Sequence, residues 1–347
     1  MKTYFIGADV DSKMTELAVE RNGEIVCRQR VPTSIVELKG FLAGLGGHKA
    51  LSLEEGPMAD WLYRNLKDSV DELVVCDPRR NKLISCDGDK DDPIDAGKLA
   101  ELHRGGYLRA VYHSDSAERV LLKQWVGLYH DRVKDAVRQV NKIRARCRMH
   151  GLRAPRGFLS NPKVQKLWLA ELKGHGVAGQ LELLLAGLAT VRSQVKRSRG
   201  ELSRRVKESP IVERWKDLPG VGLIRAVTLL AYLDTPWRFA SAKKLWKYCG
   251  VGLVRTASGT DKQGRPRKGK LQLAWAVNRP LKGTVIGAAV SAIEQGHNVF
   301  ADHHRRLQRQ GVSPSNARHA VARKMLTTMW GMWKNDSRFE EALVYGG

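Results

Sequence analysis

The N-terminal quarter of the chain alternates between short runs of strand type and longer runs with helical spacing, and this alternation limits the possible folds most. Three strand-like runs come first, and Asn22 and Gly23 suit a turn between the second and the third. Helical and strand patterns then alternate. The expected strands are 3–8, 15–20, 24–30, 49–55 and 72–77, and the expected helices are 34–45 and 57–68.

The resulting order, β-β-β-α-β-α-β, predicts a particular sheet. A three-stranded meander followed by α/β alternation is the order of the ribonuclease H-like fold, and alternation itself implies a mixed sheet with helices on its faces. In that fold the first and fourth strands are neighbours, and the helix after the fifth strand packs beside them. Residues at the ends of those two strands and at the start of that helix should therefore converge.

Charge is divided unevenly along the chain, which has a formal net charge of +24. Residues 1–110 hold 16 Lys and Arg against 19 Asp and Glu, whereas residues 111–347 hold 44 against 17, a net of +27. A polyanion is the natural partner of so basic a segment. Nucleic acid is favoured over an anionic membrane surface, because neutralised phosphates release counterions and no amphipathic anchor is evident.

Several classes of protein are disfavoured by the sequence. No apolar run approaches the roughly 18 residues of a membrane span, and no signal peptide is evident. The five cysteines are scattered without a C-x-x-C pair, which predicts a reducing, cytosolic setting without disulfides. The ten histidines show neither an H-E-x-x-H pattern nor Cys/His ligand spacing, which disfavours a zinc enzyme.

Acidic residues stand where predicted strands end or a helix begins. Asp9 ends the first strand, Glu54 and Glu55 end the fourth, and Asp92 and Asp95 stand three apart on one face of a predicted helix. Converging carboxylates raise one another's pKa unless a cation joins them. Mg²⁺ prefers oxygen ligands, and two ions can activate a nucleophile and stabilise a leaving oxygen. The pattern predicts a metal site.

The acidic run CDGDKDDPIDAGK (86–98) also has two simpler interpretations. Asp91 and Asp92 suit helix capping, which the helix dipole favours. Asp87 and Asp89 suit a solvated loop. These alternatives remain open beside the metal site.

The basic part of the chain contains two long helical patterns, 116–150 and 178–207, which suggest a helical hairpin, a coiled-coil arm or a basic bundle. Further on, DLPGVGLIRAVTLLAYL (217–233) resembles a helix-hairpin-helix element. Gly220 and Gly222 would let backbone N–H groups approach a phosphate at a helix start. The alternative is an ordinary glycine-rich turn between helices.

A segment rich in Gly, Lys, Arg and Ser spans 255–270, and we expect it to contact nucleic-acid phosphates unless it is only an exposed basic loop. The expected contacts are Arg255, Lys262, Arg265, Arg267, Lys268 and Lys270. Trp125, Trp237, Trp246, Trp275 and the other tryptophans could stack on bases or fill the core, and core is favoured for most of them, because aromatics at helical spacing usually pack.

Six segments occur in an order that resembles transposases of the insertion sequence 110 family and the related pilin-gene invertases, over about residues 4–330. They are IGADVDSK, LEEGPMADWLY, VVCDPRRNKLI, KDDPIDAGKLAEL, LPGVGLIRAVTLLAYL and RTASGTDKQG. The resemblance implies a RuvC-like (RNase H-like) carboxylate domain over 1–112 and a basic helical, coiled-coil arm over 113–207. It also implies a mainly helical C-terminal transposase domain over 208–347, with the helix-hairpin-helix-like element and a nucleophilic serine.

The family's four carboxylates correspond to Asp9, Glu54, Asp92 and Asp95, which the resemblance implies as ligands of Mg²⁺, two ions in number, with Mn²⁺ as a substitute. Glu55 is the alternative to Glu54. The family usually has two small residues between its glutamate and the glycine that follows, whereas here Glu54 and Glu55 directly precede Gly56.

The serine that precedes glycine in RTASGT, Ser258, matches the family's nucleophile, whereas Ser241 in FASAKK suits a helix cap. Asp91 stands where the family usually has threonine, and its added charge has no assigned role.

The resemblance implies a transposase that recombines donor and target DNA through a covalent phosphoserine intermediate. It also implies guidance by a noncoding bridge RNA, a dimer or tetramer, and a prokaryotic cytosolic location, at the nucleoid when active. Two alternatives remain open: a RuvC-like, metal-dependent Holliday-junction endonuclease that uses water, and a non-catalytic nucleic-acid-binding protein.

Overall fold

The protein has two compact units, Met1–Val120 and Leu121–Gly347. The computed structural model describes residues 2–78, 92–256, 270–274 and 277–345. Each unit has a hydrophobic cluster of its own. The expected division into three domains stays a prediction.

The N-terminal unit contains a five-stranded mixed sheet, and the expected order of strands and helices is confirmed. The strands are β1 (Thr3–Val10), β2 (Met14–Arg21), β3 (Glu24–Pro32), β4 (His48–Glu54) and β5 (Glu72–Cys76). They lie in the order β3-β2-β1-β4-β5. The meander β1-β2-β3 is antiparallel, whereas β4 runs parallel to both β1 and β5. This is the strand order of a ribonuclease H-like sheet.

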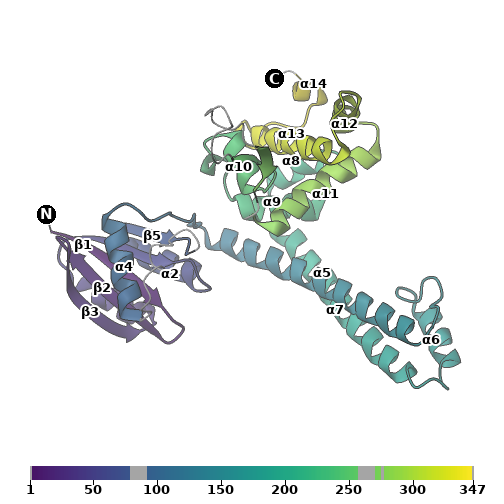
Figure 1. The fold of residues 1–347 in the computed structure, drawn as a ribbon, viewed down its shortest axis with the longest axis horizontal. Coiled ribbons are helices and arrows are strands. Elements are labelled where there is room, and N and C mark those ends of the chain that lie inside the picture. Colours follow the sequence, from purple (N-terminus) through teal and green to yellow (C-terminus); the bar gives the residue numbers. More distant parts are fainter. Residues whose placement is uncertain (1, 79–91, 257–269, 275–276, 346–347) are drawn as a thin grey trace, which may run out of the picture. The chain divides into compact units, whose positions relative to one another are not determined.

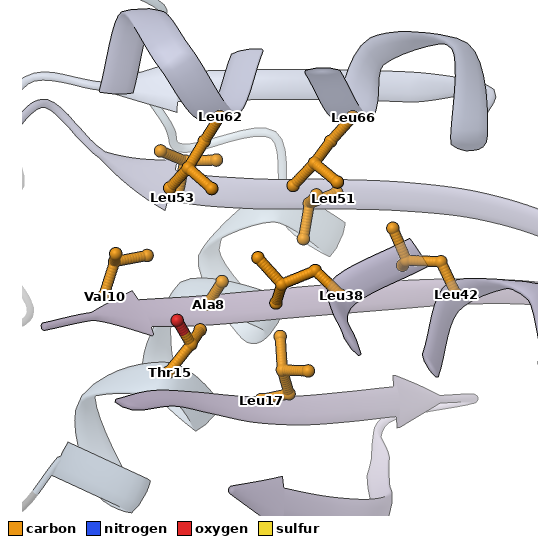
Figure 2. Close-up of a pocket in the computed structure, with 10 residues that line it drawn as sticks. All are labelled: Ala8, Val10, Thr15, Leu17, Leu38, Leu42, Leu51, Leu53, Leu62 and Leu66. Atoms are coloured by element: carbon orange, nitrogen blue, oxygen red, sulfur yellow. The ribbon is translucent and has the colours of Figure 1, made fainter. Parts of the chain in front are cut away.

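Helices α1 (Ile35–Ala43) and α2 (Ala59–Leu66) cover one face of the sheet, and the short 3-10 helix η1 (Lys67–Ser69) follows α2. Figure 2 shows the contact between this face and the two helices, in which leucines from α1 and α2 meet aliphatic side chains of β1, β2 and β4. The gap left among them is only about 10 Å³. This face is therefore a closed hydrophobic core, which leaves any chemistry to the edges and to the other face.

Helix α4 (Asp92–Arg104) crosses the other face of the sheet, over β1 and β2 (Figure 1). Its backbone comes unusually close to β1 because Gly7 has no side chain. A Cβ atom added at Gly7 would lie 1.9 Å from the carbonyl oxygen of Ala96 and 2.8 Å from the nitrogen of Ala100. The glycine therefore fixes where α4 lies on the sheet.

The second unit includes most of α5, which begins just before it, and two further helices that follow in sequence. Their bounds are α5 (Ala117–Met149), α6 (Pro162–Glu171) and α7 (Ala178–Arg205). Helices α5 and α7 run side by side (Figure 1), and residues from both helices enter two separate hydrophobic clusters. Ile143 and Leu185 belong to one cluster, Val126 and Leu202 to the other. The two long expected helices are thus confirmed, and their coiled-coil character stays a prediction.

The rest of the second unit is mainly helical around a buried core that includes Trp215 and Phe300. The helices are α8 (Pro210–Lys216), α9 (Leu223–Leu233), η2 (Pro236–Arg238), α10 (Ala242–Tyr248), α11 (Arg279–Gln295), α12 (Val299–Arg309), α13 (Pro314–Lys334) and α14 (Glu341–Tyr345). Two short strands, β6 (Leu253–Thr256) and β7 (Lys270–Leu273), form an antiparallel ribbon. In the part of the chain that the structure describes, no helix has the length and apolar character needed to cross a bilayer.

The tryptophans only partly follow the expectation of burial. Trp125 and Trp246 pack at the edge of the main cluster. Trp237 in η2 is 71% exposed, so it is not among the tryptophans that fill the core. Its short helix lies at the surface, where the ammonium of Lys334 sits 5.2 Å from the centre of its ring. Trp275 lies outside the described residues.

Candidate active site

The register of the sheet places Asp9 and Glu54 next to each other. Ala8 of β1 pairs with Leu53 of β4 in the parallel ladder, and each carboxylate is the next residue along its strand. Both strands run in the same direction, so their carboxyl ends meet at one edge of the sheet. The predicted adjacency of the first and fourth strands therefore brings the two side chains together.

Both carboxylates lie on the face that α4 covers. Successive residues of a strand point to opposite faces, and Ala8 and Leu53 line the core beneath α1 and α2 (Figure 2). Their neighbours in sequence point the other way. Ser52, two residues before Glu54, donates its hydroxyl to the carbonyls of Ile6 (3.1 Å) and of Leu99 in α4 (3.3 Å).

The close contact at Gly7 brings a third carboxylate to this place. Asp95 lies in the first turn of α4, one residue before Ala96, whose carbonyl faces Gly7. Asp9 follows Gly7 by two residues and therefore shares its face. Burial raises the pKa of Glu54, and the negative charges of Asp9, Asp95 and Asp77 raise it further. The structure thus places Asp9, Glu54 and Asp95 within electrostatic reach of one another.

Asp77 joins the cluster although the motif analysis did not select it. It follows the last residue of β5, and Cys76 pairs with Glu54 in the parallel ladder. The signal was present in the sequence, because VVCD ends a predicted strand in the same way as the other acidic strand ends. Asp92 opens α4, three residues before Asp95, and its side chain lies outside the described part of the chain.

Glu55 has a different environment, which separates it from Glu54. The buried imidazole of His113 donates its Nδ1–H to Asp60 (2.6 Å) and its Nε2–H to Glu55 (2.7 Å). Burial opposes the charge of His113, but the hydrogen bonds with Asp60 and Glu55 raise its pKa to about 9. The imidazolium therefore holds Glu55, whereas Glu54 faces Asp9 and Asp95.

The chemistry of this cluster fits a hard divalent cation. Its donors are carboxylate oxygens, which Mg²⁺ prefers. The pKa of Glu54 is raised by burial first and then by the charges of Asp9, Asp95 and Asp77, which a bound cation would offset. Among the described side chains, no three His, Cys, Asp or Glu are arranged to hold one ion by themselves. The set expected from the sequence has a further member, Asp92, at the start of α4.

A pocket of about 220 Å³ lies beside Glu54, between the ends of β1 and β4 and the start of α2. Its lining is apolar at Val10, Leu53 and Met58, and polar at Asp11 and Ser12. Of the clustered carboxylates, Glu54 lines this hollow.

The expected nucleophile and most of its basic neighbours lie outside the described residues: Ser258, Lys262, Arg265, Arg267 and Lys268. The ribbon of β6 and β7 brackets this segment, with Thr256 opposite Lys270, and Arg255 is exposed on β6. The chain before β6 is fixed to the helical core, because Arg323 of α13 donates to the carbonyl of Val251 (3.1 Å).

In the glycine-rich turn between α8 and α9, the structure shows what lies beside Gly220. Gly220, with φ of 78°, lies against α11, and a Cβ there would be 2.2 Å from the carbonyl oxygen of Ala288. Its close approach is thus to a helix of the same unit. Gly222 is exposed at the start of α9. Ser241 caps α10 by accepting from the N–H of Lys244, as expected.

Comparison with known proteins agrees with this arrangement. A family model described as transposase, of the IS110 type with a DEDD domain, matches residues 6–148, which include Asp9, Glu54, Asp92 and Asp95. A second model, described as transposase IS116/IS110/IS902 family, matches residues 212–305.

The chain belongs to the IS110 family of transposases. It is also similar to a putative transposase, y4qE, of Sinorhizobium fredii, with 24% identity over 352 residues that cover 94% of this chain and 88% of the relative. As an IS110 family transposase it is a DNA-binding, strand-transferring enzyme, and a DEDD domain is of the kind that depends on divalent metal.

Proposed function

We propose that this IS110 family transposase is a site-specific recombinase that cuts and rejoins DNA with Ser258 as nucleophile and its acidic cluster as metal site. The observation that carries the proposal is the convergence of Asp9, Glu54 and Asp95, which follows from the register of β1 and β4 and from the close contact of α4 at Gly7. The match of the C-terminal transposase model over 212–305, which spans Ser258, supports the second half of the site.

Asp9, Glu54, Asp92 and Asp95 would hold Mg²⁺, two ions in number, and Mn²⁺ would substitute for it. Bound there, the metal supplies positive charge that stabilises a developing oxyanion on phosphate. The protein's part is to fix the carboxylates: the register of β1 and β4 sets two of them, and Gly7 sets the helix that carries Asp95. We propose Glu54 rather than Glu55 as the ligand, because Glu55 is hydrogen-bonded with His113.

In the proposed step the hydroxyl oxygen of Ser258 attacks a DNA phosphorus. An Oγ–P bond forms, the P–O3′ bond breaks, the serine proton passes to solvent and the 3′ oxygen takes up a proton. A phosphodiester is kept as a phosphoserine linkage, so the reverse attack by a 3′ hydroxyl reseals DNA without an energy source. A serine hydroxyl is a weak nucleophile, which is why the proposed step needs a metal site.

Guidance by a structured bridge RNA that pairs with donor and target DNA follows from the family resemblance. The charge distribution supports it, because residues 111–347 carry a net of +27, enough for a second nucleic acid beside DNA. The decisive measurement is sequencing of RNA that co-purifies with the protein. One discrete noncoding RNA encoded beside the gene supports guidance, and a random RNA population counts against it.

The central experiment compares Ser258→Ala with Asp92→Asn on DNA that carries the element's ends. We expect the first to abolish the covalent protein–DNA adduct and the second to abolish all cutting. A junction endonuclease that uses water would keep cutting after Ser258→Ala. If the protein only binds nucleic acid, Asp92→Asn would leave its function intact.

We further propose that the enzyme works as a dimer or tetramer in which one subunit supplies the carboxylates and another supplies Ser258. The motivation is that Ser258 stands far along the chain from the carboxylates. Mixing Asp92→Asn protein with Ser258→Ala protein should restore strand exchange. Failure of such mixtures to complement, while each wild-type control is active, would contradict the arrangement.

A further inference from the structure

One transverse row of residues crosses the face of the sheet that α4 covers, and it continues beyond the carboxylates. Asp9 of β1 pairs with Glu16 of β2, and Glu16 pairs with Arg30 of β3. Because paired residues on adjacent strands share a face, all three point to the same side. Arg30 thus stands two strands from Asp9, roughly 10 Å away at the usual strand spacing.

Arg28 stands on the same face, two residues before Arg30. It pairs with Ala18 of β2, which is the partner of Gly7. Its guanidinium lies over α4, where a Cβ added at Gly97 would be 3.2 Å from Nη2. Two arginines therefore follow the edge strand β3 beside the acidic cluster.

Arg30 is held in place and yet open to a ligand. Its Nε lies 3.2 Å from the carboxylate of Glu16, and its side chain is 63% exposed whereas that of Glu16 is 14% exposed. A surface ion pair of this kind contributes little to stability. Its effect is to orient the guanidinium of Arg30, most of which stays exposed to solvent.

The net negative charge of residues 1–110 suggests what Arg28 and Arg30 do. Residues 1–110 have three more acidic than basic residues, and the carboxylates gather at one edge. A DNA strand that approaches them is repelled unless nearby cations bind its phosphates. A planar guanidinium binds phosphate with two hydrogen bonds, which fixes its position as well as its charge.

We propose that Arg30 and Arg28 form a phosphate-binding clamp on β3 that holds the DNA strand whose scissile phosphate lies at the carboxylates. The inference rests on the proposed function of that cluster. Duplex DNA carries one phosphate per roughly 3.4 Å on each strand, so the clamp contacts phosphates within about three nucleotides of the cut.

The test uses the full-length protein and a labelled DNA duplex of the element's end, in EDTA, where binding is measured without cutting. Arg30→Gln should weaken binding roughly three- to tenfold and lower the slope of log affinity against log salt by about 0.9. The double variant with Arg28→Gln should lower the slope by about twice that amount. The matched control is Lys39→Gln, which removes one exposed charge on α1, across the sheet.

Two further variants separate binding from a structural role. If Arg30 only supported the sheet through its ion pair, Glu16→Gln and Arg30→Gln would weaken binding alike. The clamp predicts opposite signs, because Glu16→Gln removes negative charge beside the DNA and tightens binding. Replacing single phosphates of the duplex by neutral methylphosphonate should weaken the wild type at one or two positions and leave Arg30→Gln unaffected there.

Failure of the clamp and failure of the carboxylate site are distinguishable. A salt slope for Arg30→Gln equal to that of Lys39→Gln overturns the clamp, even if Asp9→Asn abolishes cutting. Full cutting by Asp9→Asn overturns the carboxylate site, even if Arg30→Gln loses affinity.

Discussion

Both units bring the backbone of a helix against a glycine, but only in the N-terminal unit does this contact place acidic side chains together. A Cβ at Gly7 would meet the carbonyl of Ala96 at 1.9 Å, and one at Gly220 would meet that of Ala288 at 2.2 Å. The neighbours of the first contact are Asp9 and Asp95. The second contact joins a turn to α11 inside an apolar core.

The difference shows how the two units make use of close packing. In the sheet, period-two alternation turns one contact into a fixed relation among charged residues, because Gly7 and Asp9 must share a face. In the helical unit the contact at Gly220 joins a turn to α11. The reactive serine proposed there belongs instead to the segment that the β6–β7 ribbon brackets. The register of the sheet therefore positions the carboxylates of the proposed site, and the proposed serine lies in the sequence between β6 and β7.

Among the changes considered, Gly7→Ala should cause the largest loss of stability. The obstacle is helix backbone, which cannot turn aside, so we expect a loss of about 4 kcal/mol, above the usual 1–3 kcal/mol of overpacking. Cutting should also fall, because α4 must move with Asp95. Hydrogen exchange of β1 amides measures the first effect and a DNA cutting assay the second. The matched control is Gly40→Ala in α1, where a Cβ meets nothing within 4 Å. A stable, active Gly7→Ala protein would contradict the packing argument.

Gly220→Ala tests the same kind of contact in the helical unit. Its positive φ adds about 1–2 kcal/mol of backbone strain to the overpacking, which a shift of the short turn relieves in part. We therefore expect a loss of about 3 kcal/mol, confined to amides of α9 and α11 in hydrogen exchange. Gly222→Ala is the control, since its Cβ has open space. If Gly220 instead serves mainly to approach a phosphate, the variant will lose DNA affinity while its stability is unchanged.

His113→Gln should reduce the stability of the N-terminal unit by about 2 kcal/mol at neutral pH. This is less than the raised pKa of His113 alone suggests, because Glu55 and Asp60 are partly exposed and solvent screens their charges. The pKa of His113 is raised from 6.5 to about 9 on folding. A raised pKa means that the stabilisation is complete below about pH 6.5 and is lost as the pH rises through 9.

Urea unfolding at several pH values, followed by circular dichroism, measures this difference between wild type and His113→Gln. The gap should close between pH 6.5 and about 9. His150→Gln, at an exposed position, should show no such trend. A gap that stays constant with pH would mean that His113 acts through packing and not through its charge.

The sheet and its carboxylates were predictable because they follow from periodic patterns. Alternation gave the strands, the strand order gave the neighbours, and the position of Asp9 and Glu54 at strand ends then fixed their meeting. Asp95 followed from helical spacing once α4 was expected beside them. The same logic would have found Asp77, at the end of β5.

Contacts between residues far apart in sequence were not predictable. His113 meets Glu55 and Asp60 across more than 50 positions, and no local pattern announces the pair. The sequence leaves open whether the turn at Gly220 approaches a phosphate or only joins two helices, and its contact with α11 depends on how the whole unit packs. The exposure of Trp237 depends in the same way on which helices cover η2.

Asp9→Asn should have the smallest effect on stability and the most informative sign. The pKa of Glu54 is raised in the folded protein, by burial first and then by Asp9. A raised acid pKa means that folding is favoured below the unfolded value of 4.5 and disfavoured once the pH exceeds the folded value. Removing the charge of Asp9 relieves part of that penalty at neutral pH. We therefore expect a gain below about 1 kcal/mol in EDTA, while DNA cutting is abolished.

The control for Asp9→Asn is Asp11→Asn, two residues away. Hydrogen bonds from the backbone of Ser12 and Lys13 lower the pKa of Asp11, so its removal relieves nothing and should bring no gain. Addition of Mg²⁺ should then stabilise the wild type more than Asp9→Asn, because only a folded carboxylate set binds the ion. Equal stabilisation of both proteins by Mg²⁺ would mean that Asp9 takes no part in a metal site. Loss of stability in EDTA would mean that the carboxylate of Asp9 supports the fold and does not strain it.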